Sequence, residues 1–348
     1  MNVDAWIAIA ALAMFVYVAL DGYDLGIGIL MVGQDDAGRR EWTSLVNTRC
    51  DGNESWIVLV GALLLAGVPG AYDVLLPILY VPVGVTVVSL IARRVALVMM
   101  RSASSTVASG DRASLLFAAG SLLAAFSQGV AVTALAEWAS WSPDGSRAAD
   151  FDFLSWYSVL GGLTAIAVYA VAGAVWAAHK ADAPVQEQAR RMGAIVMPLA
   201  AGLVALSAGL LPTTPTTLPT DWDGRLLFVG GAVLVGSTMG IGWSSKRHRA
   251  WLVAAAIVAI EVVALGIIVG LRLAEMLPRP TNSQVGEPTS ALYLLLIAIA
   301  PCMPIVLFLN GYAVWRFRQK LAVSGAPPIA AVHSLDPELS PIQVAVGV

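Results

Sequence analysis

Residues 5–32 read AWIAIAALAMFVYVALDGYDLGIGILMV, an apolar run whose charged residues are Asp21 and Asp24. A helix needs about 20 apolar residues to cross the hydrocarbon core of a bilayer. The run exceeds that length, and no Lys or Arg precedes it, unlike the basic start of a cleaved signal peptide. We therefore expect a retained first transmembrane helix that carries two acids.

Similar apolar runs recur through the chain. Of its 348 residues, 58% are hydrophobic and 12% are charged, whereas soluble domains are about one quarter charged. The net charge of -3 also disfavours binding to nucleic acid. The sequence predicts an all-α integral membrane protein, a helix bundle with nine transmembrane helices at roughly 5–32, 52–70, 73–100, 113–138, 153–178, 192–212, 226–243, 250–277 and 291–315.

The basic residues predict the orientation of these helices. With the N-terminus outside, most of the 20 Lys and Arg residues fall in inner loops, and the exceptions are Arg147, Arg225, Arg272 and Arg279. This bias follows the positive-inside rule, so the C-terminus is expected in the cytoplasm. Residues 1–320 are predicted to form the transmembrane domain, and the proline-containing residues 321–348 a cytoplasmic tail.

Asp21 and Asp24 are the most informative polar residues. They are three positions apart and therefore share one face of the helix, towards its inner end. A carboxylate in the apolar region costs about 2.5 kcal/mol or more, so such groups usually face the bundle interior or water. One interpretation is a helix end near the membrane surface, packed through its glycines. The other is contact with water, a proton path or a cation of a partner.

A second acidic group precedes the second predicted helix. Asp51 and Glu54 have the spacing of an acidic N-cap and the N3 residue of a capping box, with Asn53 between them. Capping alone accounts for these residue types. Because they also lie on the inner side, they are equally candidates for an acidic cluster with Asp21 and Asp24, where cytoplasmic protons would enter.

Two further charged residues fall inside predicted spans. Glu261 lies in the middle of the eighth span, and a lone carboxyl there is expected to be protonated or paired with another helix or subunit. Arg93 ends the third span, where it is either a positive-inside anchor or an intramembrane polar contact. Gln128 suggests a polar contact between helices.

The sequence contains few side chains that could bind a metal ion or haem iron. The three histidines, His179, His248 and His333, lie beside charges or in the tail, and the two cysteines form no CxxC motif. Haem in a membrane bundle is usually held by histidines that project into its interior. We therefore expect no metal site, no haem bound by this chain alone, and no catalytic residue in it.

Several motifs resemble subunit II of the cytochrome bd-type quinol oxidases. Residues 20–28, LDGYDLGIG, are similar to the first-helix signature of that family. Residues 51–56, DGNESW, resemble its Asp-Gly-Asn-x-x-Trp motif, and Arg93-x-Val95-Ala96 its third-helix arginine motif. The resemblance is specific in the first hundred residues and looser afterwards.

The resemblance implies a non-haem subunit of a complex that oxidises quinol and reduces oxygen to water in the bacterial inner membrane. Haem b and haem d are then expected in a homologous subunit I, which forms a heterodimer with this chain. A small single-helix subunit, membrane lipids and a structural quinone are further partners to expect. By the same resemblance, Asp21, Asp24 and Asp51 match acidic positions linked to haem retention or cytoplasmic proton delivery. From its position, Glu54 is a further candidate for this role, and Asn53, Trp56, Arg93 and Glu261 are candidates for intramembrane polar or subunit contacts.

The chain departs from the family pattern at two places. Cys50 stands where the family usually has Trp, and Leu97 and Val98 stand where it has an aromatic residue and an acid. These changes are those of a cyanide-insensitive-like or divergent member. Two alternatives remain: a proton-coupled secondary transporter, which also needs intramembrane carboxyls, and a purely structural partner subunit.

Overall fold

A computed structural model describes residues 3–46, 55–67, 69–101, 107–141, 153–181 and 183–210. Every regular element in these ranges is helical. The α-helices are α1 (Val3–Leu30), α2 (Asp36–Val46), α3 (Ser55–Gly67), α4 (Pro69–Arg101), α5 (Val107–Trp141), α6 (Trp156–Lys180) and α7 (Ala183–Gly209), and the 3-10 turn η1 (Met31–Gly33) follows α1. The expected helical fold class is therefore confirmed for the described part of the chain.

Four described segments are long and apolar enough to cross a membrane. They are Leu76–Met100, Asp111–Trp138, Trp156–Lys180 and Pro184–Gly209. Helices also occupy the first two predicted spans, as α1 and the shorter α3. The predicted spans 226–243, 250–277 and 291–315 and the tail 321–348 lie outside the described residues, so the count of nine helices and the orientation stay predictions.

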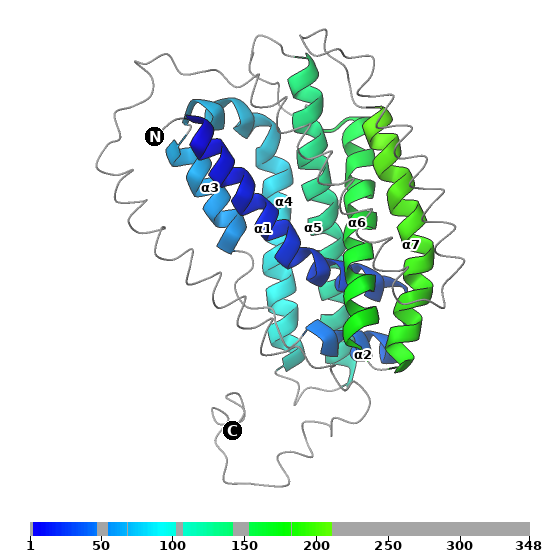
Figure 1. The fold of residues 1–348 in the computed structure, drawn as a ribbon. Helices are drawn as coiled ribbons and strands as arrows, with labels where there is room; N and C mark the ends of the chain where they lie inside the picture. The colour runs from blue at the N-terminus through cyan, green and yellow to red at the C-terminus, as the bar shows by residue number, and fades with distance from the viewer. Residues whose placement is uncertain are drawn as a thin grey trace, which may run out of the picture.

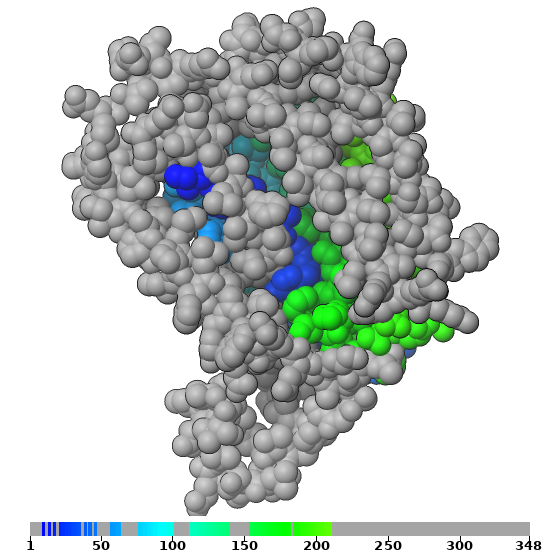
Figure 2. All heavy atoms as spheres, in the orientation of Figure 1, coloured from blue at the N-terminus to red at the C-terminus, as the bar shows by residue number. Residues whose placement is uncertain are grey.

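The long helices pack as sequence neighbours, and α1 crosses them. In Figure 1, α4, α5, α6 and α7 run roughly side by side, while α1 passes obliquely across them and α3 lies beside its N-terminal part. Contacts of α1 with α3, α5 and α6 place its acidic segment inside the bundle. Figure 2 shows blue N-terminal atoms directly against the green atoms of the α6 and α7 region.

Local chemistry explains where particular helices begin. Ser155 caps α6: its hydroxyl accepts a hydrogen bond from the Ser158 N–H, and the Ser158 hydroxyl accepts one from the Ser155 N–H. Pro69 begins α4, a position where the missing N–H of proline costs nothing. Residues 69–72, which lie outside the predicted third span at 73–100, therefore already belong to α4.

Two helices differ from the hydropathy pattern. Residues 36–46, expected as part of an inner loop, form α2, whose Trp42, Leu45 and Val46 are buried against the bundle. Helix α7 begins at Ala183, before the predicted apolar run at 192–212. Both helices contain polar residues on their solvent sides. A search for long apolar runs therefore does not detect them in full.

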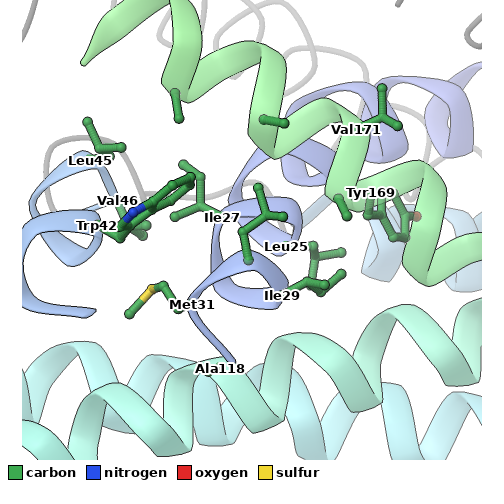
Figure 3. Packing of buried hydrophobic residues seen from close by; sticks show 14 of the residues in the cluster. Leu25, Ile27, Ile29, Met31, Trp42, Leu45, Val46, Ala118, Tyr169 and Val171 are labelled. Atoms are coloured by element: carbon green, nitrogen blue, oxygen red, sulfur yellow. The ribbon is translucent and has the colours of Figure 1, made fainter. Parts of the chain in front are cut away.

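The main core lies where α1, η1 and α2 meet α5 and α6. Figure 3 shows Leu25, Ile27 and Ile29 of α1 and Met31 of η1 between Trp42 of α2, Ala118 of α5 and Tyr169 of α6, among the residues labelled in the view. A second cluster, which includes Tyr17, Trp56 and Ile78, surrounds the first half of α1. The acidic segment therefore lies between two apolar regions.

Candidate functional site

The central feature of the site is an ion pair between α1 and α4. Nη1 of Arg93 lies 3.6 Å from Oδ2 of Asp21, and each side chain is 3% exposed. Charges removed from water need a partner, because desolvation costs several kcal/mol for each ion. Arg93 is thus a buried partner of the first-helix acid, while its predicted role in an intramembrane or subunit contact stays a prediction.

Helix α5 shapes the space that holds Arg93. The guanidinium carbon of Arg93 lies 4.9 Å from the centre of the Phe117 ring, a cation–π distance. A Cβ at Gly120 would lie 2.9 Å from Cγ of Arg93 and 3.0 Å from the Ser89 carbonyl oxygen. The lack of a side chain at Gly120 therefore leaves room for Arg93 between α4 and α5.

Asp24 is buried as deeply as Asp21. It is 1% exposed and lies on the same face of α1, one turn closer to η1. The neighbouring Tyr23 ring stacks on Trp176 of α6, with 4.5 Å between ring centres. Nζ of Lys180 lies 5.6 Å from the centre of the same Trp176 ring. The residue before Asp24 thus joins α1 to an aromatic and cationic pair on α6.

A hydrogen-bonded group continues the site towards the middle of α1. Nε2 of Gln128 donates to the Tyr17 hydroxyl at 2.8 Å, and the Tyr169 hydroxyl donates to Oε1 of Gln128 at 2.6 Å. Tyr17 lies one turn before Asp21 on the same face of α1. We call Tyr17, Asp21, Arg93, Gln128 and Tyr169 the polar cluster; its members come from α1, α4, α5 and α6.

Glycines bring α1 and α6 close enough to form this cluster. A Cβ at Gly26 would lie 2.5 Å from the Gly173 nitrogen and 2.8 Å from its Cα, and it would overlap the Tyr169 carbonyl oxygen. A Cβ at Gly22 would press on the Tyr169 ring at 3.2 Å. Small residues at such crossings allow backbones in membranes to approach closely. The glycines and acids of the first-helix motif thus act in one structural unit.

The other predicted site residues divide into two groups. Trp56 is 2% exposed, in the same apolar cluster as Tyr17, and its Nε1 has no hydrogen-bond partner among the described residues. Asp51, Asn53, Glu54 and Glu261 lie outside the described residues. An acidic cluster of Asp21, Asp24, Asp51 and Glu54 therefore stays a prediction.

Motif reasoning did not assign a function to three members of the polar cluster. Tyr17 and Tyr169 resemble ordinary aromatic residues of apolar helices, and Gln128 suggested only a polar contact between helices. A signal existed in the spacing of Tyr17 and Asp21, which are four residues apart and therefore neighbours on one helical face. The partners on α5 and α6 need tertiary structure to be found.

The described residues do not offer the donors that haem iron usually takes. Among them, no group of three or more His, Cys, Asp or Glu is placed to hold a metal ion. The histidine in these ranges, His179, is exposed in the last turn of α6. Haem in a bundle needs side chains that project inward, so the described part of this chain does not fit an internal haem site.

Comparisons with known proteins agree on one family. The family model described as cytochrome bd terminal oxidase subunit II matches residues 2–317. Cytochrome bd ubiquinol oxidase subunit 2 of Bacillus subtilis (strain 168) is 25% identical over 197 residues, which cover 56% of this chain and 58% of the relative. A chain in the structure of bd oxidase from Geobacillus thermodenitrificans is 18% identical, with a TM-score of 0.65 over 91% of this chain and 99% of that one, and supports the fold.

Proposed function

The chain belongs to the cytochrome bd terminal oxidase subunit II family, and we propose that it serves as the non-haem subunit of a bacterial quinol oxidase. In this reaction two quinols are oxidised to quinones, and one oxygen molecule takes up four electrons and four protons to give two waters. The buried Asp21–Arg93 pair carries the proposal, because it links the family's first-helix and third-helix motifs across two helices.

The haems are proposed to lie in a subunit I that forms a heterodimer with this chain. When bound there, they carry the electrons from quinol to oxygen. The donor set supports this division, since the described part of this chain offers one exposed histidine and no metal-binding group. A single-helix third subunit and a structural lipid or quinone are further proposed partners, inferred from the family alone.

The proposed work of this chain is to hold its partner in place and to contribute to proton delivery from the cytoplasm. Asp21 faces Arg93, so its charge is compensated within the chain. Asp24 is equally buried, one turn nearer the predicted inner side, where cytoplasmic protons would arrive. We propose that Asp24, with Asp51 and Glu54, exchanges these protons, and that Asp21 mainly stabilises the bundle around them.

The departure from the family pattern at Val98 does not affect the polar cluster. Val98, which stands where the family has an acid, is 60% exposed on α4, whereas Leu97 is buried. Arg93 and Asp21 are both buried. A carboxyl at position 98 would therefore face outward from the described part of the chain, and its loss does not remove a member of the polar cluster.

The proposal is tested in the complex produced by co-expression with the neighbouring subunit I gene. Asp24→Asn and Asp51→Asn are expected to lower oxygen uptake per haem, and Asp21→Asn to lower haem content. Arg191→Gln is the matched control, since Arg191 and its partner Glu187 are exposed. Normal haem content and normal oxygen uptake in all three aspartate variants would contradict the proposed role of the acids.

A reduced-minus-oxidised absorbance spectrum separates the proposal from its alternatives. Haem bands in the co-purified complex, and none in the isolated chain, are expected for a non-haem oxidase subunit. A transporter would instead show ion-coupled uptake when the isolated chain is placed in vesicles. A purely structural partner would retain haem-normalised turnover in the Asp24→Asn and Asp51→Asn variants.

A further inference from the structure

Phe117 of α5 lies where three helices meet. Its side chain is 0% exposed. The guanidinium carbon of Arg93, on α4, lies 4.9 Å from the centre of the Phe117 ring. On α1, a Cβ at Gly28 would lie 3.1 Å from Cε1 at the edge of the same ring. The ring is therefore close to both α1 and α4, and the backbone of α1 restricts its movement.

The residues one turn after Phe117 fix the neighbouring helices. Gly120 and Ser121 are three and four positions further along α5, so they share one helical face with Phe117. A Cβ at Gly28 of α1 would overlap the Ser121 hydroxyl, and a Cβ at Gly120 would lie 2.9 Å from Cγ of Arg93. One short stretch of α5 thus determines both how closely α1 approaches and where the stem of Arg93 lies.

The ion pair alone does not orient the guanidinium. Its Nη1 lies 3.6 Å from Oδ2 of Asp21, whereas charge-assisted hydrogen bonds between nitrogen and oxygen are about 2.7–2.9 Å long. A single contact at this distance attracts the cation but does not set the plane of the group, as a bidentate pair would. The negative face of an aromatic ring also attracts a cation, and more strongly where water is excluded. Phe117 therefore gives Arg93 a second point of attraction.

We propose that Phe117 is a positioning residue, whose ring face holds the guanidinium of Arg93 towards Asp21. The inference rests on the proposed function, because the haem retention it serves is that of the oxidase. Two helices then determine where the cation lies: α1 through the Asp21 carboxylate and α5 through the ring. Without the attraction of the ring, Arg93 occupies other rotamers, and the pair between the first-helix and third-helix motifs forms less often.

A ring that only fills space predicts the opposite response to fluorine. Fluorine atoms draw electron density away from the ring face, so they weaken its attraction for a cation. They leave the shape of the ring nearly unchanged and make it more apolar. If Phe117 only packs in the core, fluorination should leave stability unchanged or raise it. If the ring positions Arg93, stability should fall with each added fluorine.

The experiment uses the complex with subunit I, in which Phe117 is replaced by mono-, di- and trifluorinated phenylalanine through a suppressed stop codon. The matched control is the same series at Phe126 of α5, where the ring packs against Gly162 and no cation of the described residues lies over it. The Phe117 series is repeated in the double variant Asp21→Asn with Arg93→Leu, which lacks the cation. Melting temperature and haem content per complex are measured for each protein.

We expect the trifluorinated ring at Phe117 to lower the melting temperature by roughly 2–4 °C, with intermediate values for fewer fluorines. Haem content should fall in the same order. The series at Phe126, and the Phe117 series without Arg93, should show no such decrease. A flat or rising Phe117 series would overturn the inference in favour of packing alone. Equal decreases at Phe126, or in the variant without Arg93, would also overturn it, because the effect would not depend on the cation.

Phe117→Leu tests the same coupling if a fluorinated complex fails to assemble. It should lower the melting temperature more with Arg93 present than in the double variant, and equal losses in the two backgrounds would overturn the inference.

Asp21→Asn, Asp24→Asn and Asp51→Asn complexes measured in parallel keep the two proposals apart. If all three have normal haem content and normal turnover, the proposed function fails. Losses in these variants together with a flat Phe117 series reject only the role of Phe117.

Discussion

Nη1 of Arg93 on α4 lies 3.6 Å from Oδ2 of Asp21 on α1, and both side chains are 3% exposed. Two further helices, α2 and α3, separate these elements in the chain. The pair therefore ties together segments that are distant in sequence, and it does so where water is largely excluded. Its consequences for stability are open to direct measurement.

Removal of one member of the pair should be costly. Arg93→Leu leaves a buried carboxylate without its cation, and such changes cost about 3–5 kcal/mol. The double variant Asp21→Asn with Arg93→Leu should be more stable than Arg93→Leu alone, because no uncompensated charge remains. Thermal stability of the detergent-solubilised chain, followed by size-exclusion chromatography, provides the measurement.

Arg94→Gln is the control for the ion pair, since Arg94 is adjacent in sequence but only partly buried. We expect its effect to be much smaller than that of Arg93→Leu. Arg93→Lys should recover only part of the stability, because lysine lacks the planar group that lies over Phe117. Equal losses at positions 93 and 94 would show that the pair contributes nothing specific.

The crossing of α1 and α6 should not tolerate a methyl group. Gly26→Ala places a Cβ 2.5 Å from the Gly173 nitrogen, so the helix backbones must separate. Overpacking of this kind costs about 1–3 kcal/mol. Gly84→Ala is the control, because no atom lies within 4 Å of a Cβ there and alanine favours the helix. The same thermal assay should therefore show a loss for the first variant and none for the second.

A side-chain hydrogen bond should help to hold the short helix α2 in place. Nε1 of Trp42 donates to Oε1 of Gln188 on α7 at 2.9 Å, and Gln188 also hydrogen-bonds to Gln34. Trp42→Phe keeps much of the apolar packing but loses this bond, worth about 0.5–1.5 kcal/mol. Faster amide hydrogen exchange is expected in residues 36–46. Trp156→Phe, at an exposed position, should leave that exchange unchanged.

The orientation predicted from the basic residues can be tested with the native Cys50. This residue is expected on the cytoplasmic side, so a membrane-impermeant maleimide should label it in inside-out vesicles and not in right-side-out ones. Gly70→Cys in a Cys50→Ser background should show the opposite pattern. Labelling of Cys50 from the outside would reverse the topology.

The length of the apolar runs was sufficient to predict most of the described helices. Runs of about 20 apolar residues predicted α1, α4, α5 and α6, with ends that differ by up to six residues from those observed. A bilayer requires that length, and backbone hydrogen bonds must be satisfied within the helix. The same signal missed α2 and the first residues of α7. Both segments contain charged and polar residues, so their sequences are not uniformly apolar.

Part of the candidate site was also predictable. The spacing of Asp21 and Asp24 placed both acids on one face, and both are buried in the described structure. The motif at Arg93 marked a residue worth attention, but it did not identify its partner. Nothing local indicated that Gln128 would contact both Tyr17 and Tyr169.

The sequence by itself determined the helical membrane architecture and the presence of two acids in the apolar first helix, where a carboxylate is energetically unfavourable. Both features depend on the composition and spacing of neighbouring residues. The tertiary structure alone decided which cation faces Asp21, which amide hydrogen-bonds to Tyr17, and why Gly26 must lack a side chain. Those relationships join α1 to α4, α5 and α6. They arise only when folding brings side chains that are far apart in the chain into contact in one closely packed interior.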